Sequence, residues 1–277
     1  MTSDAILSNL NEENNALPNQ SPIGIGRGQI LIDHSRRVFR ALAGFRVYES
    51  GWLRPWATYC FSPVLSRVAT EKIARFDGFY ARLGQGDLYT FANVFADYPV
   101  VDLVRALPKV ELIVDLGANV GAFSFLIQTL CRKMGCNPPI VALEPDAANV
   151  AFLRGQPFAG ALEIHRAAVG RSSGTARLVA GRNSVTHHVD FSAKAQGQTV
   201  PVISFDSLCD RPALVKMDIE GGELEVLEGG LPENVRHLVL EWHHPGAPSE
   251  LVPGDWMQIS NDIHGASTWY WRRVPAR

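Results

Sequence analysis

Beyond about residue 108, short apolar runs alternate with stretches whose apolar positions have helical spacing. The apolar runs have the length of buried strands, and the stretches between them have the amphipathic period of surface helices. Strands that alternate with helices are typical of a parallel sheet covered by helices. This part of the chain therefore predicts an α/β fold with a mostly parallel sheet and helices on both faces.

Five strands, two crossover helices and a closing strand pair follow from this pattern. The predicted strands cover residues 111–115, 139–143, 162–167, 214–217 and 236–241. The first crossover helix covers residues 120–131, and the second begins after Asp146, a suitable N-cap. Residues 170–203 favour irregular or hairpin structure. The closing pair is predicted at 255–260 and 268–274, after a connection that its prolines keep short or irregular.

The first 87 residues have a different character. Residues 1–22 are polar and lack Lys and Arg, which predicts a disordered tail. Residues 23–82 carry ten Lys+Arg and four Asp+Glu, and the apolar spacing of residues 32–47 predicts an amphipathic helix. We expect residues 23–87 to form a helical N-terminal cap and residues 88–277 to form one α/β domain.

Composition and charge exclude several classes of protein. The chain has 277 residues, is 46% hydrophobic and carries a net charge of −2. These values exclude a disordered protein and give no field that would attract nucleic acid. No apolar run reaches the roughly 18 residues of a membrane span, and the start lacks a basic leader region, so we expect a cytoplasmic protein. The four cysteines form no CxxC pair, so no disulfide framework or zinc site is predicted.

A turn with two glycines follows the first predicted strand. The strand ends at Asp115, and Gly117 and Gly121 precede the next helix, so a ligand can approach the backbone and the free N–H groups of the helix. A dinucleotide fingerprint needs GxGxxG, whereas Asn119 stands at its middle glycine. An acid ahead of the first glycine suits a cationic group, such as the amino group of a methionine moiety, better than a pyrophosphate.

A second acid stands at the end of the second predicted strand. Glu144 lies 23 residues after Gly121, where a carboxylate accepts hydrogen bonds from ribose hydroxyls in nucleotide-binding folds. Ligands of open parallel sheets bind outside the carboxyl ends of the strands. We therefore expect Asp115, Glu144, Asp218 and Glu241, which all stand at strand ends, to converge on one edge of the sheet.

Several segments between residues 88 and 244 resemble the FkbM-type family of S-adenosylmethionine-dependent methyltransferases. The matching strings are VDLGANVGAFS (114–124), VALEPDAANVAFL (141–153), RAAVG (166–170), SFDSL (204–208), VKMDIEGGELEVLEGG (215–230) and LVLEWHH (238–244). The string DIEG-x-E is the most specific of these. The resemblance implies a class I, Rossmann-like methyltransferase domain that binds S-adenosylmethionine.

The resemblance also implies roles for individual residues. The methionine part of the cofactor is expected beside Asp115, Gly117, Asn119 and Gly121, its ribose beside Glu144, and its adenine beside Ala167 and Ala168. Asp218 and Glu220 close the fourth strand, where acceptor and sulfonium meet in class I folds. Glu241 and His243 end the fifth.

The implied reaction is transfer of a methyl group to a hydroxyl, commonly that of a sugar in a glycosylated metabolite or polysaccharide. An alcohol must lose its proton during transfer, and a histidine titrates near neutral pH. His243 is the first candidate for the general base and Asp218 the second, with Glu241 able to orient the imidazole. These three residue types also suit Mg²⁺ or Mn²⁺, but nothing in their spacing requires a metal, and none is predicted.

Two other functions stay open at this point. One is an NAD-dependent oxidoreductase, and the other is a cofactor-binding module without catalysis that docks a partner through the basic N-terminal unit. The expected partner of an enzyme is a small-molecule or glycan acceptor, not nucleic acid. Aromatic clusters near both ends of the chain predict a homodimer.

Overall fold

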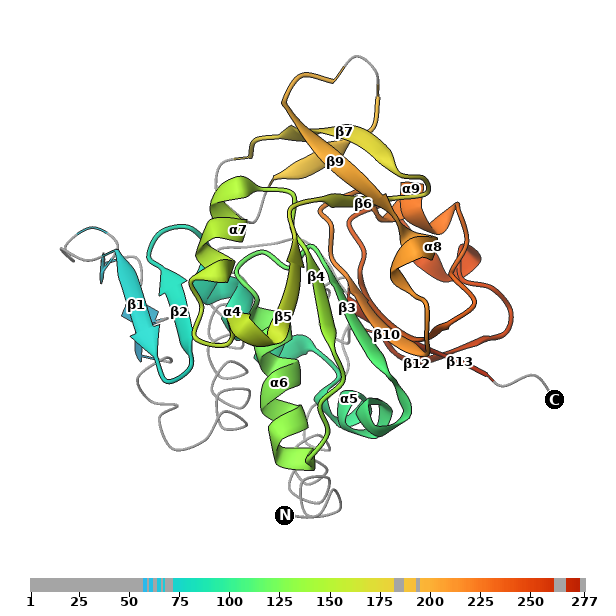
Figure 1. Ribbon diagram of the computed structural model, residues 1–277, viewed down its shortest axis with the longest axis horizontal. Coiled ribbons are helices and arrows are strands. Elements are labelled where there is room, and N and C mark those ends of the chain that lie inside the picture. The colour runs from blue at the N-terminus through green and yellow to red at the C-terminus, as the bar shows by residue number, and fades with distance from the viewer. Residues whose placement is uncertain are drawn as a thin grey trace, which may run out of the picture.

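The computed structural model describes residues 57–58, 60–61, 64–65, 67, 72–181, 187–192, 195–261 and 268–274. The predicted disordered tail and the predicted helix at 32–47 lie outside these residues. Beyond residue 108, strands and helices alternate as expected and build an α/β domain (Figure 1). No helix in the described ranges is long and apolar enough to cross a membrane.

A seven-stranded sheet forms the centre of the domain. Its strands, in spatial order, are β12 (Trp256–Asn261), β13 (Thr268–Arg273), β11 (Val235–Glu241), β10 (Ala213–Met217), β3 (Leu112–Leu116), β4 (Ile140–Leu143) and β5 (Leu162–His165). The last five are parallel, and β13 is antiparallel to both of its neighbours. The five predicted strands and the closing pair are confirmed.

Helices cover both faces of this sheet because its strands are apolar on both sides. Ile113 of β3 packs into the core beneath one set of helices, and its neighbour Val114 packs into the core on the opposite face. The first face carries α4 (Asp87–Asp97), α5 (Val100–Ala106), α6 (Ala122–Met134) and α7 (Ala147–Arg154). The second carries the short helices α8 (Phe205–Leu208) and α9 (Glu223–Leu227).

Local sequence signals fix two of the connections. The carboxylate of Asp146 accepts a hydrogen bond of 2.8 Å from the backbone N–H of Asn149, which confirms it as the N-cap of α7. The proline-rich connection after β11 holds only one short 3-10 helix, η3 (Pro248–Glu250), as predicted. The other 3-10 helices are η1 (Leu107–Lys109) and η2 (Ala159–Ala161).

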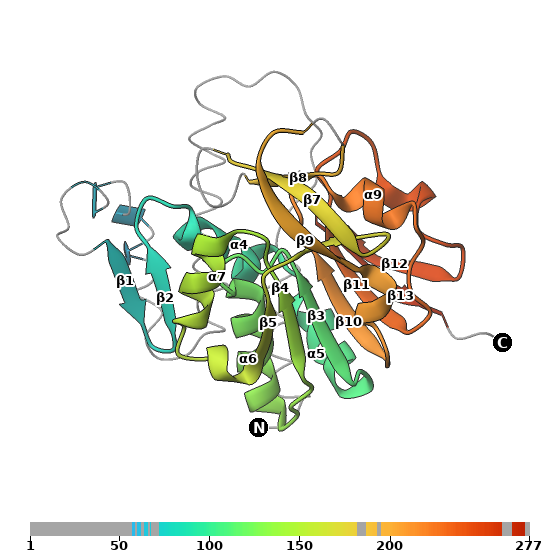
Figure 2. The same cartoon turned by 45° about the horizontal axis from the view of Figure 1, so that its top comes forward.

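A second, four-stranded sheet lies beyond the carboxyl ends of the central strands (Figure 2). Its strands, in spatial order, are β6 (Ala168–Gly170), β9 (Gln198–Ser204), β7 (Gly174–Val179) and β8 (His188–Asp190). It has a small apolar core of its own, which includes Val200 and Leu178. In this sheet β7 is antiparallel to β8 and to β9, whereas β6 is parallel to β9, so the described part of the segment predicted as irregular or hairpin structure is mostly β-sheet.

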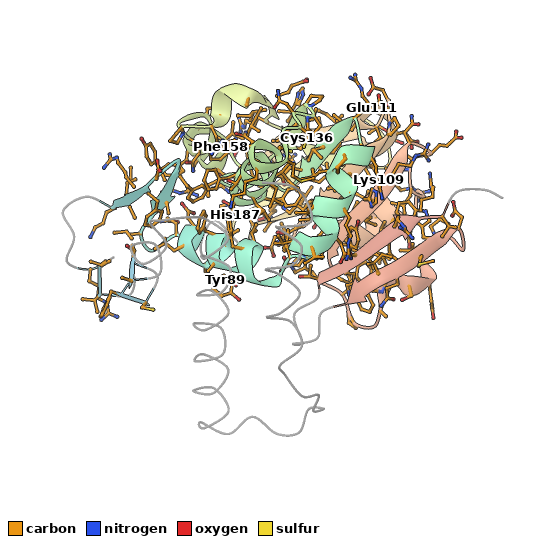
Figure 3. All side chains as sticks on the ribbon, turned by 90° about the horizontal axis from the view of Figure 1, so that it is seen from below. Tyr89, Lys109, Glu111, Cys136, Phe158 and His187 are labelled. Atoms are coloured by element: carbon orange, nitrogen blue, oxygen red, sulfur yellow. The ribbon has the colours of Figure 1, made fainter. Side chains whose placement is uncertain are left out.

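The described end of the predicted helical cap differs from that prediction. Residues 73–82 form an antiparallel hairpin of β1 (Ile73–Phe76) and β2 (Phe79–Arg82). The buried ring of Phe79 lies 4.5 Å from that of Phe91 in α4 and 5.5 Å from that of Phe125 in α6. It also stacks on Phe158, which is labelled in Figure 3. An aromatic cluster thus joins the hairpin at residues 73–82 to the α/β domain.

Candidate active site

One cavity opens at the carboxyl ends of the central strands, where the sequence analysis places the ligand. Gly117 and Asn119 follow β3, Glu144 follows β4, and Asp218 and Glu220 follow β10; all five line the cavity. The second sheet closes it with an apolar wall that includes Val169, Val189 and Phe191. Polar groups from three strand ends therefore face an apolar wall across a single cavity.

The glycine turn brings the backbone of β3 against the end of β10. Gly117 has a left-handed φ of 74°, and a Cβ atom there would lie 1.8 Å from the carbonyl oxygen of Asp218. The backbone N–H of Gly117 donates to the carbonyl of Leu143 at the end of β4. Asn119 has a left-handed φ of 49°, which asparagine tolerates better than most residues. Only glycine fits at position 117, and the turn holds three strand ends together.

Glu144 is buried and held by three hydrogen bonds. The backbone N–H of Asn119 donates to its Oε2 at 2.8 Å, and the backbone N–H of Asp146 donates to its Oε1 at 2.9 Å. The side-chain amide of Asn149 donates to Oε1 at 3.3 Å. Burial raises the pKa of Glu144 to about 7, although the three hydrogen bonds lower it. A carboxylate accepts about four hydrogen bonds, so Oε2 keeps a position for a ligand.

A chain of polar contacts connects Glu144 to the N-terminal hairpin. Asn149 accepts a hydrogen bond of 2.7 Å from the guanidinium of Arg82. Arg82 also makes a two-pronged ion pair with the fully buried Asp87, at 2.8 and 3.0 Å. Gln156 bridges the backbones of Tyr80 and Val120. The contacts of Arg82 with Asn149 and of Tyr80 with Gln156 join residues 67 and 76 positions apart in sequence, so no local sequence pattern reveals them.

Asp115 takes a structural position behind the cavity. Its side chain is fully buried, accepts a hydrogen bond of 2.7 Å from Ser124, and lies 3.4 Å from the ammonium of Lys216. Lys216 also donates to the backbone carbonyls of Leu116 and Gly117, at 3.2 and 2.6 Å. Burial lowers the pKa of Lys216, but the charges of Asp218 and Asp115 outweigh it and raise that pKa overall. The ion pair thus clamps the glycine turn onto β10.

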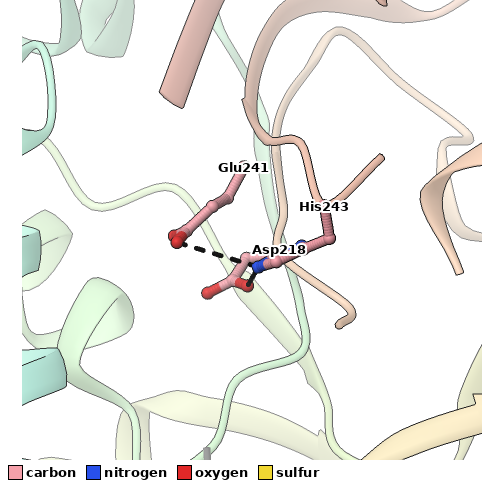
Figure 4. A group of neighbouring side chains, drawn as sticks. All are labelled: Asp218, Glu241 and His243. Atoms are coloured by element: carbon pink, nitrogen blue, oxygen red, sulfur yellow. Dashed lines mark ion pairs between the residues drawn. The ribbon is translucent and has the colours of Figure 1, made fainter. Parts of the chain in front are cut away.

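The three predicted catalytic residues lie together at the ends of β10 and β11. His243 Nε2 lies 4.0 Å from Asp218 Oδ1 and 3.8 Å from Glu241 Oε1 (Figure 4). Asp218 lines the cavity. Within the part of the chain that the structure describes, Glu241 and His243 are not among the lining residues. One carboxylate oxygen of Asp218, one of Glu241 and one ring nitrogen of His243 lie within 4.8 Å of one another. Atoms with this spacing can hold a metal ion.

Charge crowding shifts the titration of this group. The charge of Asp218 and burial raise the pKa of Glu241 to about 8. Burial and the same charge raise the pKa of Glu220 to about 7. Burial lowers the pKa of His243, but its hydrogen bond to Glu223 and the neighbouring carboxylates raise it to about 9. The cluster therefore favours bound positive charge and protons near neutral pH.

Two further members of the DIEG-x-E string belong to the site: Glu220, which was expected there, and Glu223, for which the sequence analysis predicted no role. Glu220 lines the cavity with a left-handed φ of 52°. Glu223 is fully buried, and its Oε1 accepts from the backbone N–H groups of Ile219 and Gly221 at 3.2 Å and from His243 Nδ1 at 2.9 Å. The string thus forms a loop that its own second glutamate ties to the end of β11. The only sequence signal was the spacing of its acids.

The other predicted residues divide between the cavity and the core. Ala167 and Ala168, which were expected beside the adenine, line the cavity. His187, which the sequence did not single out as a site residue, also lines it and lies 3.5 Å from Asp146. Gly121 instead begins α6 in a left-handed conformation and faces the side chains of Leu153 and Phe158. The aromatic residues Trp256, Tyr270 and Trp271, near the C-terminus, are buried in the two apolar cores of the central sheet.

The sequence match to known families agrees with this geometry. The model of the Methyltransferase FkbM domain matches residues 115–262, which is more than half of the chain. The chain belongs to the FkbM methyltransferase family. The match spans the glycine turn, Glu144 and the whole acidic cluster, so the FkbM assignment covers the cavity described above. The family match decides against the NAD-dependent oxidoreductase that the sequence left open. No curated protein matches the chain.

Solved structures similar to this FkbM chain include three methyltransferases. The FkbM methyltransferase of Methylobacillus flagellatus KT is 16% identical, with a TM-score of 0.40; the match covers 78% of this chain and 59% of that one. The putative methyltransferase yhhF of Escherichia coli is 13% identical, with coverages of 63% and 85% and a TM-score of 0.36. The O-methyltransferase of Bacillus cereus, in complex with SAH, is 9% identical, with coverages of 78% and 97% and a TM-score of 0.36. The family assignment rests on the match to residues 115–262.

The close approach at Gly117 predicts a difference between two glycines with the same backbone conformation. Gly117 and Gly135 both have left-handed φ angles, but a Cβ at Gly135 meets nothing within 4 Å. Gly135→Ala should lower the free energy of unfolding by about 1–2 kcal/mol, which is the cost of a left-handed backbone for an alanine. Gly117→Ala should cost about 2 kcal/mol more because its methyl group meets the Asp218 carbonyl. Urea denaturation of both variants measures this difference, and equal losses would contradict the close approach.

Proposed function

We propose that the protein is an S-adenosylmethionine-dependent O-methyltransferase that acts on a hydroxyl of a sugar in a glycosylated metabolite or polysaccharide. The observation that carries the proposal is the shared cavity. Glu144, a carboxylate of the ribose-binding type, and Asp218, which belongs to the acidic cluster, line the same cavity from different strand ends. A cofactor and an acceptor can therefore meet there.

The cavity residues fit the three parts of the cofactor. Oε2 of Glu144 has an acceptor position for a ribose hydroxyl. Ala168, Val169 and Phe191 offer an apolar wall suited to a purine. Gly117 and Asn119 line the cavity after β3, so the methionine part can lie close to the end of that strand. The negative charge of Asp218 and Glu220 suits a positively charged sulfonium.

The chain's own contribution to the reaction is alignment and proton removal. Bound S-adenosylmethionine supplies an electrophilic methyl group. The strand ends hold the acceptor in line with it, which accounts for the larger part of the acceleration. The acceptor's hydroxyl proton passes to the cluster of Asp218, Glu241 and His243, and Asp218 is the member of that cluster that lines the cavity. General base assistance of this kind contributes about 10²- to 10⁴-fold.

A sugar acceptor agrees with the polar side of the cavity. Carboxylates accept hydrogen bonds from neighbouring hydroxyls, and Asp218 and Glu220 present two of them side by side at the end of β10. The family resemblance points to the same class of acceptor. Transfer of radiolabelled methyl groups to a panel of glycosides tests the proposal, and transfer to none of them while a protein or nitrogen acceptor is methylated would contradict it.

Loss of the Glu144 charge should weaken cofactor binding. Glu144→Gln keeps the size of the side chain but replaces a charged acceptor, which should lower the affinity for S-adenosylhomocysteine about 10- to 100-fold. Glu163→Gln is the matched control, because Glu163 is an exposed carboxylate on β5 outside the cavity. Isothermal titration calorimetry measures both. Unchanged affinity in Glu144→Gln would contradict the ribose contact.

Cofactor affinity should rise with pH around neutrality. The pKa of Glu144 is about 7, and its ionised form is the better acceptor for a ribose hydroxyl. Binding therefore favours loss of a proton, and the affinity should be about tenfold lower at pH 6 than at pH 8. Calorimetry with S-adenosylhomocysteine over this range measures the effect. The Glu144→Gln variant should show a flat profile, and an equal slope in both proteins would assign the effect to another group.

Asp218→Asn separates catalysis from cofactor binding. The substitution removes a proton acceptor at the cavity wall and keeps the shape of the side chain, so methyl transfer should fall about 10²- to 10⁴-fold. Binding of S-adenosylhomocysteine should change less than threefold. Asp210→Asn, at an exposed carboxylate paired with Arg211, is the control for both measurements. A wild-type protein that binds cofactor but methylates no acceptor would favour the module without catalysis.

A further inference from the structure

The imidazole of His243 faces three carboxylates without a hydrogen bond to any of them. Its Nε2 lies 3.7 Å from Glu220 Oε2, 3.8 Å from Glu241 Oε1 and 4.0 Å from Asp218 Oδ1. Hydrogen bonds of this type are about 2.7–3.2 Å long, so these atoms surround a common point rather than bond to one another. Figure 4 shows three of the four side chains converging on it from the ends of two strands.

The separations are close to those that a bound divalent ion sets between its ligands, although longer than the separation of adjacent ligands. Mg²⁺ keeps its ligands at about 2.0–2.1 Å in octahedral geometry. Two ligand atoms on such an ion are therefore about 3.0 Å apart at right angles and about 4.2 Å apart when opposite. The distances from Nε2 fall between these limits, and the ligand atoms of Asp218, Glu241 and His243 lie within 4.8 Å of one another. Only one ligand of an octahedral ion can lie opposite Nε2, so at least one of Asp218 and Glu241 must approach Nε2 by about 1 Å, to about 3.0 Å.

A buried carboxylate outside this group fixes the imidazole in the orientation that a metal ligand needs. Nδ1 of His243 donates to Oε1 of Glu223 at 2.9 Å, and Glu223 is fully buried beneath the loop that follows β10. Because Nδ1 carries the donated proton, the lone pair of the neutral ring is on Nε2, which faces the other three acids. Histidine ligands of metals typically give their second N–H to such a carboxylate.

The carboxylates around Nε2 of His243 outnumber the ammonium group beside them. The ammonium of Lys216 lies 3.5 Å from Asp218 Oδ2 and 3.4 Å from Asp115 Oδ1, so it leaves Oδ1 of Asp218 on the side of His243. Glu220 and Glu241 add two more carboxylates on that side.

We propose that Asp218, Glu241 and His243 bind one divalent cation of the Mg²⁺ or Mn²⁺ class at the carboxyl ends of β10 and β11. Two hard oxygen ligands and one imidazole suit these ions better than the softer sites of zinc or copper. Because Asp218 also lines the cavity, an ion there lies where it can polarise the hydroxyl of an acceptor. That catalytic role rests on the proposed function, whereas the binding of the ion does not.

Titration of the purified full-length protein with Mn²⁺ tests the site. After treatment with a chelator, the electron paramagnetic resonance signal of free Mn²⁺ should show one bound ion per chain. Glu241→Gln should weaken that binding at least tenfold, and Glu223→Gln should weaken it about 10- to 100-fold through the imidazole. Glu163→Gln is the matched control, because Glu163 also pairs with a histidine, His165, at 2.7 Å but on the exposed surface of β5.

Three results would overturn the proposal: no binding of Mn²⁺ to the wild-type protein at millimolar concentration, unchanged binding in Glu241→Gln, or an equal loss in Glu163→Gln. Crystals of the wild-type protein soaked in Mn²⁺ give a test that does not depend on the folding of variants. An anomalous peak within about 2.5 Å of the three ligand atoms supports the site, and a peak only elsewhere overturns it. S-adenosylhomocysteine binding that persists without Mn²⁺ binding contradicts this inference alone and leaves the proposed function standing.

Discussion

The close contact between the glycine turn and the end of β10 is the constraint on which the site depends. A side chain at Gly117 would overlap the carbonyl of Asp218, so the two strand ends can meet only with glycine there. The buried Lys216 reinforces this contact, since it bonds to the carbonyls of β3 and neutralises acids from both strands. The glycine turn and Asp218 of the acidic cluster thereby line the same cavity.

Much of the α/β fold could be predicted from the chain alone, because apolar runs that are buried on both faces identify central strands without any knowledge of their partners. The five parallel strands, the closing pair and the Asp146 cap follow from such local signals. The N-terminal hairpin does not. It is stabilised by Phe79 among distant aromatic rings and by Arg82 reaching Asn149, and contacts of this range leave no local period in the sequence.

The site was predictable where a backbone requirement fixes the residue type, and less so where burial decides the role. Gly117 and Glu144 lie in the cavity because a tight turn and a strand end place them there. Asp115 is also an acid near the end of its strand, but it lies behind the turn. There it pairs with Lys216 and accepts a hydrogen bond from Ser124. The role of Glu223 could not be predicted from the string to which it belongs: Glu223 is fully buried and orients His243.

In the proposed function the two ends of the cavity have different tasks: the β4 end would hold a nucleoside, and the ends of β10 and β11 would hold charge beside the reacting atoms. The most direct test of this division is a crystal structure with S-adenosylhomocysteine. The account predicts the ribose within hydrogen-bond distance of Glu144 and the sulfur facing Asp218. A ligand bound at any other place on the chain, or one reversed so that its adenine lies against Asp218, would contradict it.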